Sequence, residues 1–270
     1  MPCEIIRGMP EALYRKAPGI SQSQDKYYRA NTPAHALAEI KKHAVAEDDD
    51  EKDHLINGTC LHALILEEKT IFEEDIGRKT KKNPKQPEGD IYLLSPHNAA
   101  IVRGMAAGIR RNPEIMEMID SRFETEVSIF WDDKEFGRLK ARIDYMWPRG
   151  IGDLKTTRTG ADLRSFKKAM QEFGYAVQAS HYFDAAIEAE YFSTFPNSCD
   201  DFFFAVVENF EPYEANKIKI SHEAIQAGAH ELRKLREIRY ACEKLQKWPG
   251  YLYDPQGVSL PKWRMDQEEF

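Results

Sequence analysis

The chain has 270 residues and a formal net charge of −7, which argues against a protein that coats nucleic acid over its whole surface. Its four cysteines are scattered without the spacing of zinc ligands, so neither a disulfide framework nor an iron–sulfur cluster is indicated. The longest apolar run, Phe202–Val207, is far shorter than the roughly 20 residues that cross a bilayer, and the first residues form no apolar signal core. We therefore expect a soluble, cytoplasmic protein with no membrane partner.

The N-terminal part of the chain, residues 1–120, is predicted to be mainly helical. Ser21 or Ser23 can cap a helix that runs through Tyr28, and Thr32-Pro33 can open another. A third helix is expected over Asn57–Glu67. Further helix starts are indicated where a capping residue precedes proline, at Ser95-Pro96 and Asn112-Pro113.

A basic stretch interrupts these helices. Gly77–Asp90 is rich in Lys, Pro and Gly and has no apolar period, which predicts a loop. Its run Arg78–Lys85 includes Lys81 and Lys82, two candidate DNA contacts, although a solvated charge run is the alternative interpretation. A locally basic surface on an acidic protein is compatible both with DNA contacts and with a solvated charge run.

From Phe123 the apolar period changes from helical to alternating. Strands are expected over Phe123–Trp131, Phe136–Trp147 and Ile151–Lys155, and three strands in a row indicate a meander. The later elements are predicted as a helical stretch broken near Gly174, a strand and a long helix: Ala161–Ala189, Phe202–Val207 and Glu223–Trp248. No linker separates these parts. We therefore expect one α/β domain over residues 1–270, in which a mixed sheet is flanked by helices and residues 121–210 form the catalytic core.

Charged side chains gather on one face of the second strand. Because side chains alternate along a strand, two sets of residues should face opposite ways. The charged set is Arg138, Lys140, Arg142 and Asp144, and the apolar set is Leu139, Ala141, Ile143 and Tyr145. The next strand presents Ile151, Asp153 and Lys155 on one face, and Glu126 on the preceding strand can point to the same side.

This pattern suits metal-assisted cleavage of phosphodiester bonds. Hard divalent cations prefer clustered carboxylate oxygens, and a hairpin that aligns Asp144 with Asp153 would place two within reach of one ion. Lys155 could then orient a water molecule or neutralise charge that develops on a phosphate. From spacing alone, the alternative is that Asp153 and Lys155 merely flank the end of a strand.

Several motifs in a fixed order along the chain carry a resemblance to a known family. Ile143-Asp144 and Gly152–Thr157 resemble the PD-(D/E)XK nuclease motif in its D-x-K form. Asn57–His62 and Tyr175–Tyr182 are similar to segments of RecE-type exonucleases, as are Pro18–Ser21 and Leu260–Trp263 near the two ends of the chain. The resemblance covers essentially the whole chain and implies the PD-(D/E)XK nuclease fold. The shorter carboxylate at Asp153, where many relatives have Glu, is normal in this branch.

The resemblance also implies roles for individual residues. The metal ligands would be His62, Asp144, Asp153 and the carbonyl of Leu154, and the catalytic group would comprise Lys155, Asp153, Asp144, Gln178, Tyr182 and Glu126. Without the resemblance, His62 reads as a buried structural histidine, and Glu126 could either bind the metal or only support its ligands. Arg138, Lys140, Arg142 and Thr156 are candidate DNA contacts, but the arginines and lysine could instead pair with carboxylates, and Thr156 could simply finish its strand.

The implied activity is hydrolysis of double-stranded DNA from its ends with two Mg²⁺ ions, for which Mn²⁺ could substitute. Family similarity further implies a processive 5′-to-3′ direction, a 3′ single strand passed to an annealing protein, and a homo-oligomeric ring of three or four subunits. Two alternatives stay open. One is a structure-specific or sequence-specific endonuclease on the same scaffold, and the other is a catalytically silent DNA-binding accessory protein.

Overall fold

The computed structural model describes residues 3–29, 31–45, 53–67, 72–74, 92–192 and 201–251. Its helices are α1 Glu11–Lys16, α2 Gln22–Lys26, α3 Pro33–Val45, α4 Asp53–Leu66, α5 Pro96–Arg111, α6 Pro113–Asp120, α7 Leu163–Phe173, α8 Tyr175–Glu188 and α9 His222–Leu245. Its strands are β1 Glu4–Ile6, β2 Phe72–Glu74, β3 Tyr92–Leu94, β4 Glu124–Asp133, β5 Gly137–Trp147, β6 Gly150–Thr157, β7 Asp201–Glu208 and β8 Ala215–Lys219.

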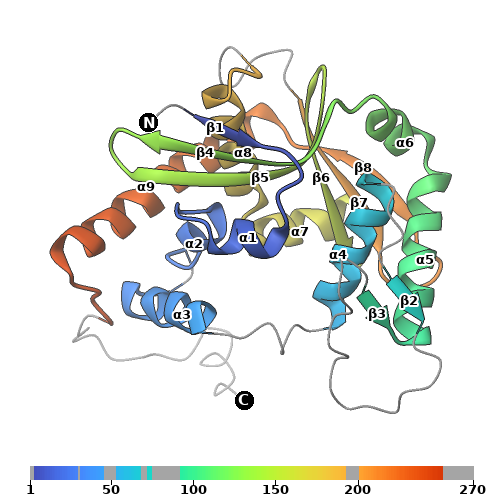
Figure 1. Cartoon of the computed structure of the whole chain (residues 1–270), viewed down its shortest axis with the longest axis horizontal. Coiled ribbons are helices and arrows are strands. Elements are labelled where there is room, and N and C mark those ends of the chain that lie inside the picture. Colours follow the sequence, from blue (N-terminus) through green and yellow to red (C-terminus); the bar gives the residue numbers. More distant parts are fainter. Residues whose placement is uncertain are drawn as a thin grey trace, which may run out of the picture.

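A mixed six-stranded sheet forms the centre of the molecule, in the order β1-β4-β5-β6-β7-β8 (Figure 1). The predicted meander is confirmed, because β4, β5 and β6 pair antiparallel with their chain neighbours. The chain then crosses through α7 and α8 to β7, which pairs parallel with β6. The change from antiparallel to parallel pairing occurs at β6, the strand that carries Asp153 and Lys155.

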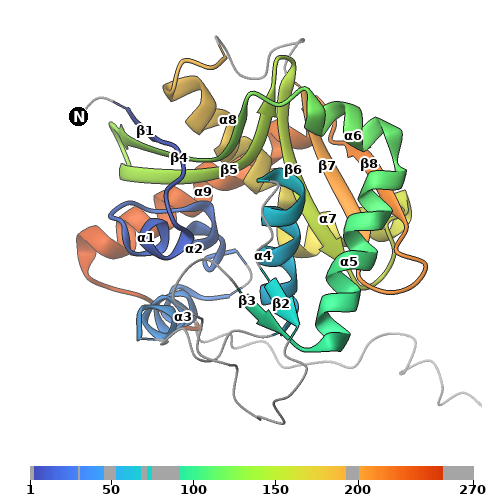
Figure 2. The same cartoon turned by 45° about the vertical axis from the view of Figure 1, so that its right-hand side comes forward.

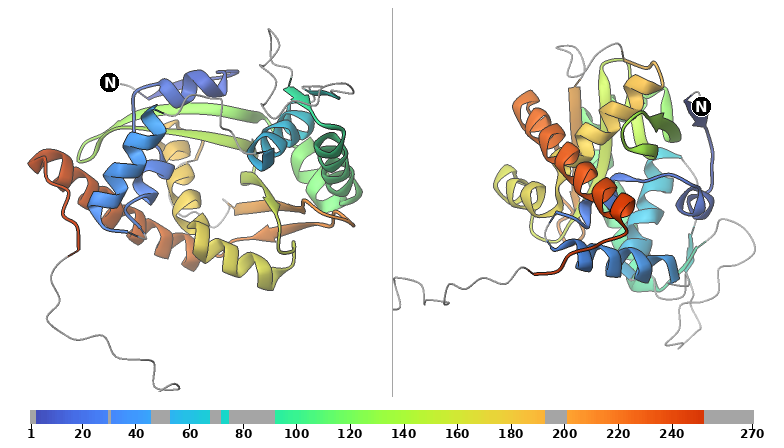
Figure 3. Two further views of the ribbon diagram at one scale, coloured as in Figure 1. Left: turned by 90° about the horizontal axis from the view of Figure 1, so that it is seen from below. Right: turned by 90° about the vertical axis from the view of Figure 1, so that its left-hand side faces the viewer.

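Helices cover both faces of this sheet (Figures 2 and 3). Helices α4, α5 and α6 lie over the half formed by β6–β8, and α8, backed by α9, lies on the opposite face. The first face buries one apolar cluster that includes Leu61, Met105 and Leu154. The second buries a cluster that includes Ile151 and Phe183. Among the helices that the structure describes, none is long and apolar enough to cross a membrane.

The helical stretch after β6 breaks where the sequence predicts. Helix α7 ends at Gly174, whose backbone has φ +63°, a left-handed conformation that glycine adopts without steric cost. Helix α8 begins at the next residue and runs back across the sheet. This turn fixes the direction of the helix that carries Gln178 and Tyr182.

Three strand pairs differ from the predicted elements. The first residues of the chain were expected to be helical, but Glu4–Ile6 forms β1 and pairs with β4. Strand β8 was not predicted and pairs with β7, and the short strands β2 and β3 pair with each other. Each of these strands has only three to five residues, too few to show an alternating pattern, so pairing with a neighbour determines their conformation.

The faces of β5 also differ from the prediction. Leu139, Ala141 and Ile143 join the apolar cluster under α8, as one shared face requires. Tyr145, two residues further on, instead joins the cluster under α4 and α5. The regular alternation of β5 is therefore interrupted at Asp144, which lies between these two stretches.

Candidate active site

Strands β5 and β6 separate at the two central aspartates. Their pairing runs from Trp147 opposite Gly150 to Tyr145 opposite Gly152, and Asp144 and Asp153 are the next residues on the two strands. A side chain at Gly152 would place its Cβ 2.0 Å from the Tyr145 ring, so glycine is required for this close approach. The sheet thus opens into a fork between β5 and β6 at the buried carboxylates of Asp144 and Asp153.

Glu126 lies at a break in the neighbouring strand pair. It is the one residue of β4 without a partner in the β4–β5 register, and its φ of 49° is unusual for a residue other than glycine. Arg142 Nε donates to Glu126 Oε2 at 2.7 Å and also binds the carbonyl of Met9 through its Nη1 at 2.5 Å. These contacts hold the Glu126 carboxylate beside the fork, and strained backbone of this kind is typical of functional sites.

His62 reaches the fork from α4. Its Nε2 lies 3.0 Å from the carbonyl oxygen of Leu154, which can only accept, so Nε2 carries a proton. Its Nδ1 faces Oε1 of Glu126 at 3.1 Å and Oδ2 of Asp144 at 3.7 Å. Ligand atoms of His62, Glu126 and Asp144 all lie within 4.8 Å of one another. One nitrogen and two carboxylates at this spacing fit a divalent cation.

The second half of the fork is built on Asp153. This side chain is fully buried, and its Oδ1 accepts a hydrogen bond of 2.5 Å from Gln178 Nε2. Its Oδ2 lies 2.5 Å from the ammonium of Lys155. Gln178 also donates to the hydroxyl of Tyr182, one helix turn further on, at 3.1 Å.

Burial and neighbouring charges shift the pKa values of the groups at the fork. Burial, followed by the charge of Asp153, raises the pKa of Asp144 to about 7. Burial lowers the pKa of His62, but Asp144 and Glu126 outweigh it and raise that pKa to about 10. The positively charged imidazolium of His62 thus balances part of the charge of Asp144 and Glu126. It would lose its Nδ1 proton if that nitrogen bound a metal ion.

Lys155 remains charged at this site. Burial alone would lower its pKa, but the carboxylates of Asp153 and Asp144 raise it above its ordinary value. The ammonium also lies 5.2 Å from the centre of the Tyr175 ring. Lys155 is therefore suited to stabilise negative charge, and a protonated amine cannot serve as a general base.

The sequence matches a family model over residues 21–253, and that family is described as a "PDDEXK-like domain of unknown function (DUF3799)". The chain belongs to this PDDEXK-like family. Its mixed sheet with flanking helices is the α/β nuclease fold that the sequence predicts. The finer expectation of a RecE-type member stays a prediction.

A solved structure resembles this PDDEXK-like chain over its whole length. It is the crystal structure of a protein named "Putative exonuclease" from Eubacterium rectale, with a TM-score of 0.60 and 16% sequence identity. The match covers 96% of this chain and 95% of the other. At this identity the likeness shows the shared fold. Among curated proteins, none matches this sequence.

Two basic residues of β5, which the sequence offers either as DNA contacts or as partners of carboxylates, are engaged within the fold. Lys140 is buried, and its ammonium donates to the carbonyls of Tyr14, Arg15 and Ala17, so it secures the N-terminal segment. Arg142 is engaged by Glu126 and thereby supports the site itself. In both cases acceptors within the fold satisfy the charged group.

The other predicted DNA contacts stay predictions. Arg138 pairs with Glu4 and Asp132, and its position six residues before Asp144 places it roughly 20 Å along the strand from the fork. Thr156 is partly exposed and follows Lys155 on β6. Two predicted lysines of the basic loop, Lys81 and Lys82, lie outside the described residues.

Sequence reasoning assigned no role to Tyr175 or Lys26. Tyr175 lies beneath the Lys155 ammonium and is the first residue of α8. Lys26 ends α2, and its charge is close enough to that of Lys155 for the two to interact. Tyr175 belongs to a recognised motif and could have been found from it, whereas the sequence around Lys26 contains no signal.

Proposed function

We propose that this protein is a metal-dependent exonuclease that hydrolyses double-stranded DNA from its ends. The observation that carries the proposal is the placement of two groups at one fork of the sheet. The His62, Glu126 and Asp144 group offers ligands to a cation, and Asp153 with Lys155 stands beside it. Membership of the PDDEXK-like family supports phosphodiester hydrolysis as the reaction.

The donor set indicates which residues would hold metal. His62, Glu126 and Asp144 form one group, while Asp153 and the carbonyl of Leu154 adjoin it. Carboxylate and carbonyl oxygens favour Mg²⁺ or Mn²⁺, and we propose two ions. Bound there, such ions lower the pKa of water and stabilise charge on a phosphoryl oxygen.

The chain's own residues supply orientation and charge. Gln178 holds one oxygen of Asp153 and leaves the other to Lys155, so both groups keep a fixed geometry. The Lys155 ammonium would stabilise the charge that builds on the attacked phosphate. Tyr182, whose pKa lies well above its ordinary value because of burial, stays protonated and can donate a hydrogen bond.

Linear and covalently closed circular duplexes of one sequence distinguish an exonuclease from an endonuclease. We expect the linear duplex to be degraded with Mg²⁺ while the closed circle stays intact, because the substrate is a DNA end. A labelled 5′ end should be released first if digestion runs 5′ to 3′. Cutting of the circle at a comparable rate would favour the endonuclease, and binding without cutting would favour the silent accessory protein.

We further propose a closed ring of three or four subunits around the DNA, acting with a single-strand annealing protein. A chain of net charge −7 would hold DNA weakly by phosphate contacts, whereas an enclosing ring retains the duplex through many cycles. Light scattering at micromolar concentration should give the mass of three or four chains. Competitor DNA added after loading should barely slow digestion. A monomer that exchanges DNA after each cleavage would exclude the ring.

A further inference from the structure

Two lysines from distant parts of the chain meet on one pair of aromatic rings. The ammonium of Lys26, at the end of α2, lies 5.7 Å from the centre of the Phe173 ring. That of Lys155 lies 5.2 Å from the centre of the Tyr175 ring. The two rings contact each other, with centroids 5.8 Å apart. The turn at Gly174 separates them along the chain, and α2 also packs against α8.

The two ammonium groups differ in whether an acceptor lies next to them. Lys155 has the carboxylate of Asp153 at 2.5 Å. For Lys26, the structure shows no carboxylate or carbonyl acceptor among the residues it describes. Burial, then the charges of Lys155 and Arg29, lower the pKa of Lys26 to about 8. A partly buried cation beside two others is unfavourable unless an anion joins it.

The neighbouring groups favour a phosphate as this anion. Arg29 is held by Glu231 at 2.7 Å and by the carbonyl of Glu172, so its guanidinium is engaged within the fold. Phe173 is 45% exposed, which leaves an apolar surface next to the two ammonium groups. Charge beside an exposed ring suits a nucleic acid strand, whose phosphates alternate with sugars and bases that stack on aromatic side chains.

We propose that Lys26 binds a phosphate of the cleaved strand next to the phosphate that is attacked beside Lys155. This inference rests on the proposed function and adds a second phosphate subsite to it. Lys26 would act in binding, and the Phe173 ring would support the sugar or base between the two phosphates. The phosphate has two possible sources: an internal phosphodiester or the terminal phosphate of the strand.

The test compares Lys26→Met with the unaltered protein on a linear duplex with Mg²⁺. We expect KM to rise by about tenfold, as for loss of one charged hydrogen bond, while kcat changes by less than about twofold. The slope of log KM against log salt concentration should fall by about 1, because one phosphate contact is lost. Lys26→Arg should keep most of the affinity.

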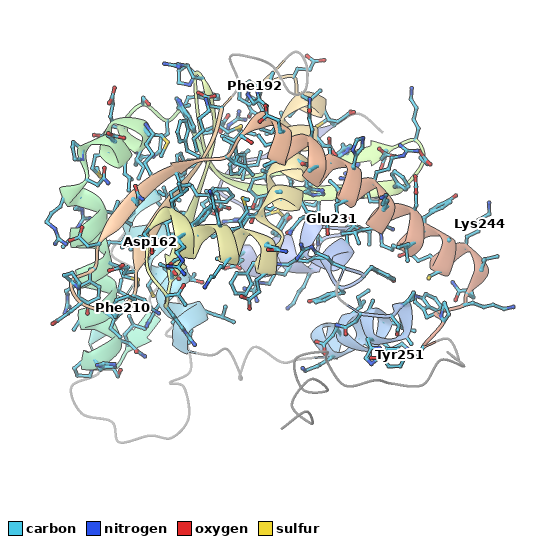
Figure 4. The ribbon with its side chains drawn as sticks, turned by 180° about the vertical axis from the view of Figure 1, so that it is seen from behind. Asp162, Phe192, Phe210, Glu231, Lys244 and Tyr251 are labelled. Carbon is cyan, nitrogen blue, oxygen red and sulfur yellow. The ribbon has the colours of Figure 1, made fainter. Side chains whose placement is uncertain are left out.

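A matched control is available on α9. Lys244 lies 5.9 Å from the centre of the Tyr240 ring, so Lys244→Met removes the same charge from a similar ring contact. It stands near the end of α9, far from Asp162, the N-cap of α7 (Figure 4), although α9 also packs against α2. Its KM and salt slope should equal those of the unaltered protein. Lys26→Met should leave the melting temperature unchanged or raise it, because no ion pair is lost.

Two modified substrates identify the phosphate. If Lys26→Met and the unaltered protein become equal on a duplex with a 5′-hydroxyl end, Lys26 binds the terminal phosphate. If they become equal only when a neutral methylphosphonate replaces the first internal linkage, it binds that phosphodiester. A difference that persists when both groups are neutral or absent would overturn the proposal, as would an unchanged KM and salt slope.

Failure of the proposed nuclease function can be distinguished from failure of the proposed phosphate contact at Lys26. If the unaltered protein cuts no DNA, that function is wrong, and Lys26 is then judged by binding of the duplex in Ca²⁺. A salt slope that is lower by about 1 in Lys26→Met supports the phosphate contact without any cleavage. Equal binding slopes for the two proteins would contradict it.

Discussion

Replacing Asp153 by alanine is expected to reduce cleavage of linear duplex DNA by about a thousandfold or more while DNA binding stays largely intact. Asp153 adjoins the candidate metal group and fixes Lys155, so its loss removes charge stabilisation worth several kcal/mol. It does not face outward, because the side chain is fully buried. Single-turnover cleavage and duplex affinity, measured in parallel, separate these two effects.

Asp153→Asn is the companion variant. It keeps the shape of the side chain and the oxygen that accepts from Gln178, so it removes charge with little change in packing. Thermal unfolding of both variants shows whether the buried Lys155 ammonium disturbs the fold once its partner is gone. Asp144→Asn should lose activity in the same way. Cleavage by Asp153→Ala within tenfold of the unaltered protein would contradict the assignment.

Replacing Lys155 by methionine should slow the chemical step by about 10²–10³-fold, the usual cost of losing one group that stabilises transition-state charge. Methionine keeps an unbranched side chain against the Tyr175 ring, so packing there changes little. Single-turnover cleavage with saturating protein measures this step without a contribution from DNA affinity.

Lys217→Met provides a control for this variant. Lys217 lies on a strand of the same sheet, with its ammonium 4.7 Å from the centre of the Phe203 ring, but on β8 rather than at the fork. It should cleave DNA at the rate of the unaltered protein. If Lys155→Met shows normal single-turnover cleavage and only weaker DNA binding, then Lys155 is a binding residue and its proposed role is wrong.

The central sheet could be predicted because its long strands alternate clearly. Strands β4 and β5 have ten and eleven residues, enough to show the period. Strands β1 and β8 are short and are fixed by their partners, which the local pattern does not contain. The change of face between Ile143 and Tyr145 was also hidden, because an alternating pattern assumes a regular strand.

Site residues were predictable to the extent that neighbours on one strand share a face. The spacing of Asp153 and Lys155 indicated their proximity, which the structure shows. His62 required the family resemblance, because a lone histidine on an apolar helix has many structural uses. The left-handed backbone of Glu126 depends on tertiary contacts and is not visible in its neighbours.

The charged face of β5 shows a second feature that the alternating sequence pattern does not predict. Alternation places Lys140 and Arg142 on one face, but it does not say what covers that face. The N-terminal segment does so in the structure, through the carbonyls of Ala17 and Met9 (Figure 1). Two cations that suggest a DNA surface in the sequence therefore stabilise the fold and the site.

The most direct test of a metal-dependent nuclease site at the fork is timed digestion of an end-labelled linear duplex by chelator-treated protein. No label should be released before Mg²⁺ or Mn²⁺ is added, and release should start on addition of either ion. Calcium should support DNA binding without efficient turnover, because its geometry is looser. The reaction must also be absent from Asp153→Asn protein prepared in parallel. Full activity in the presence of the chelator would contradict the account.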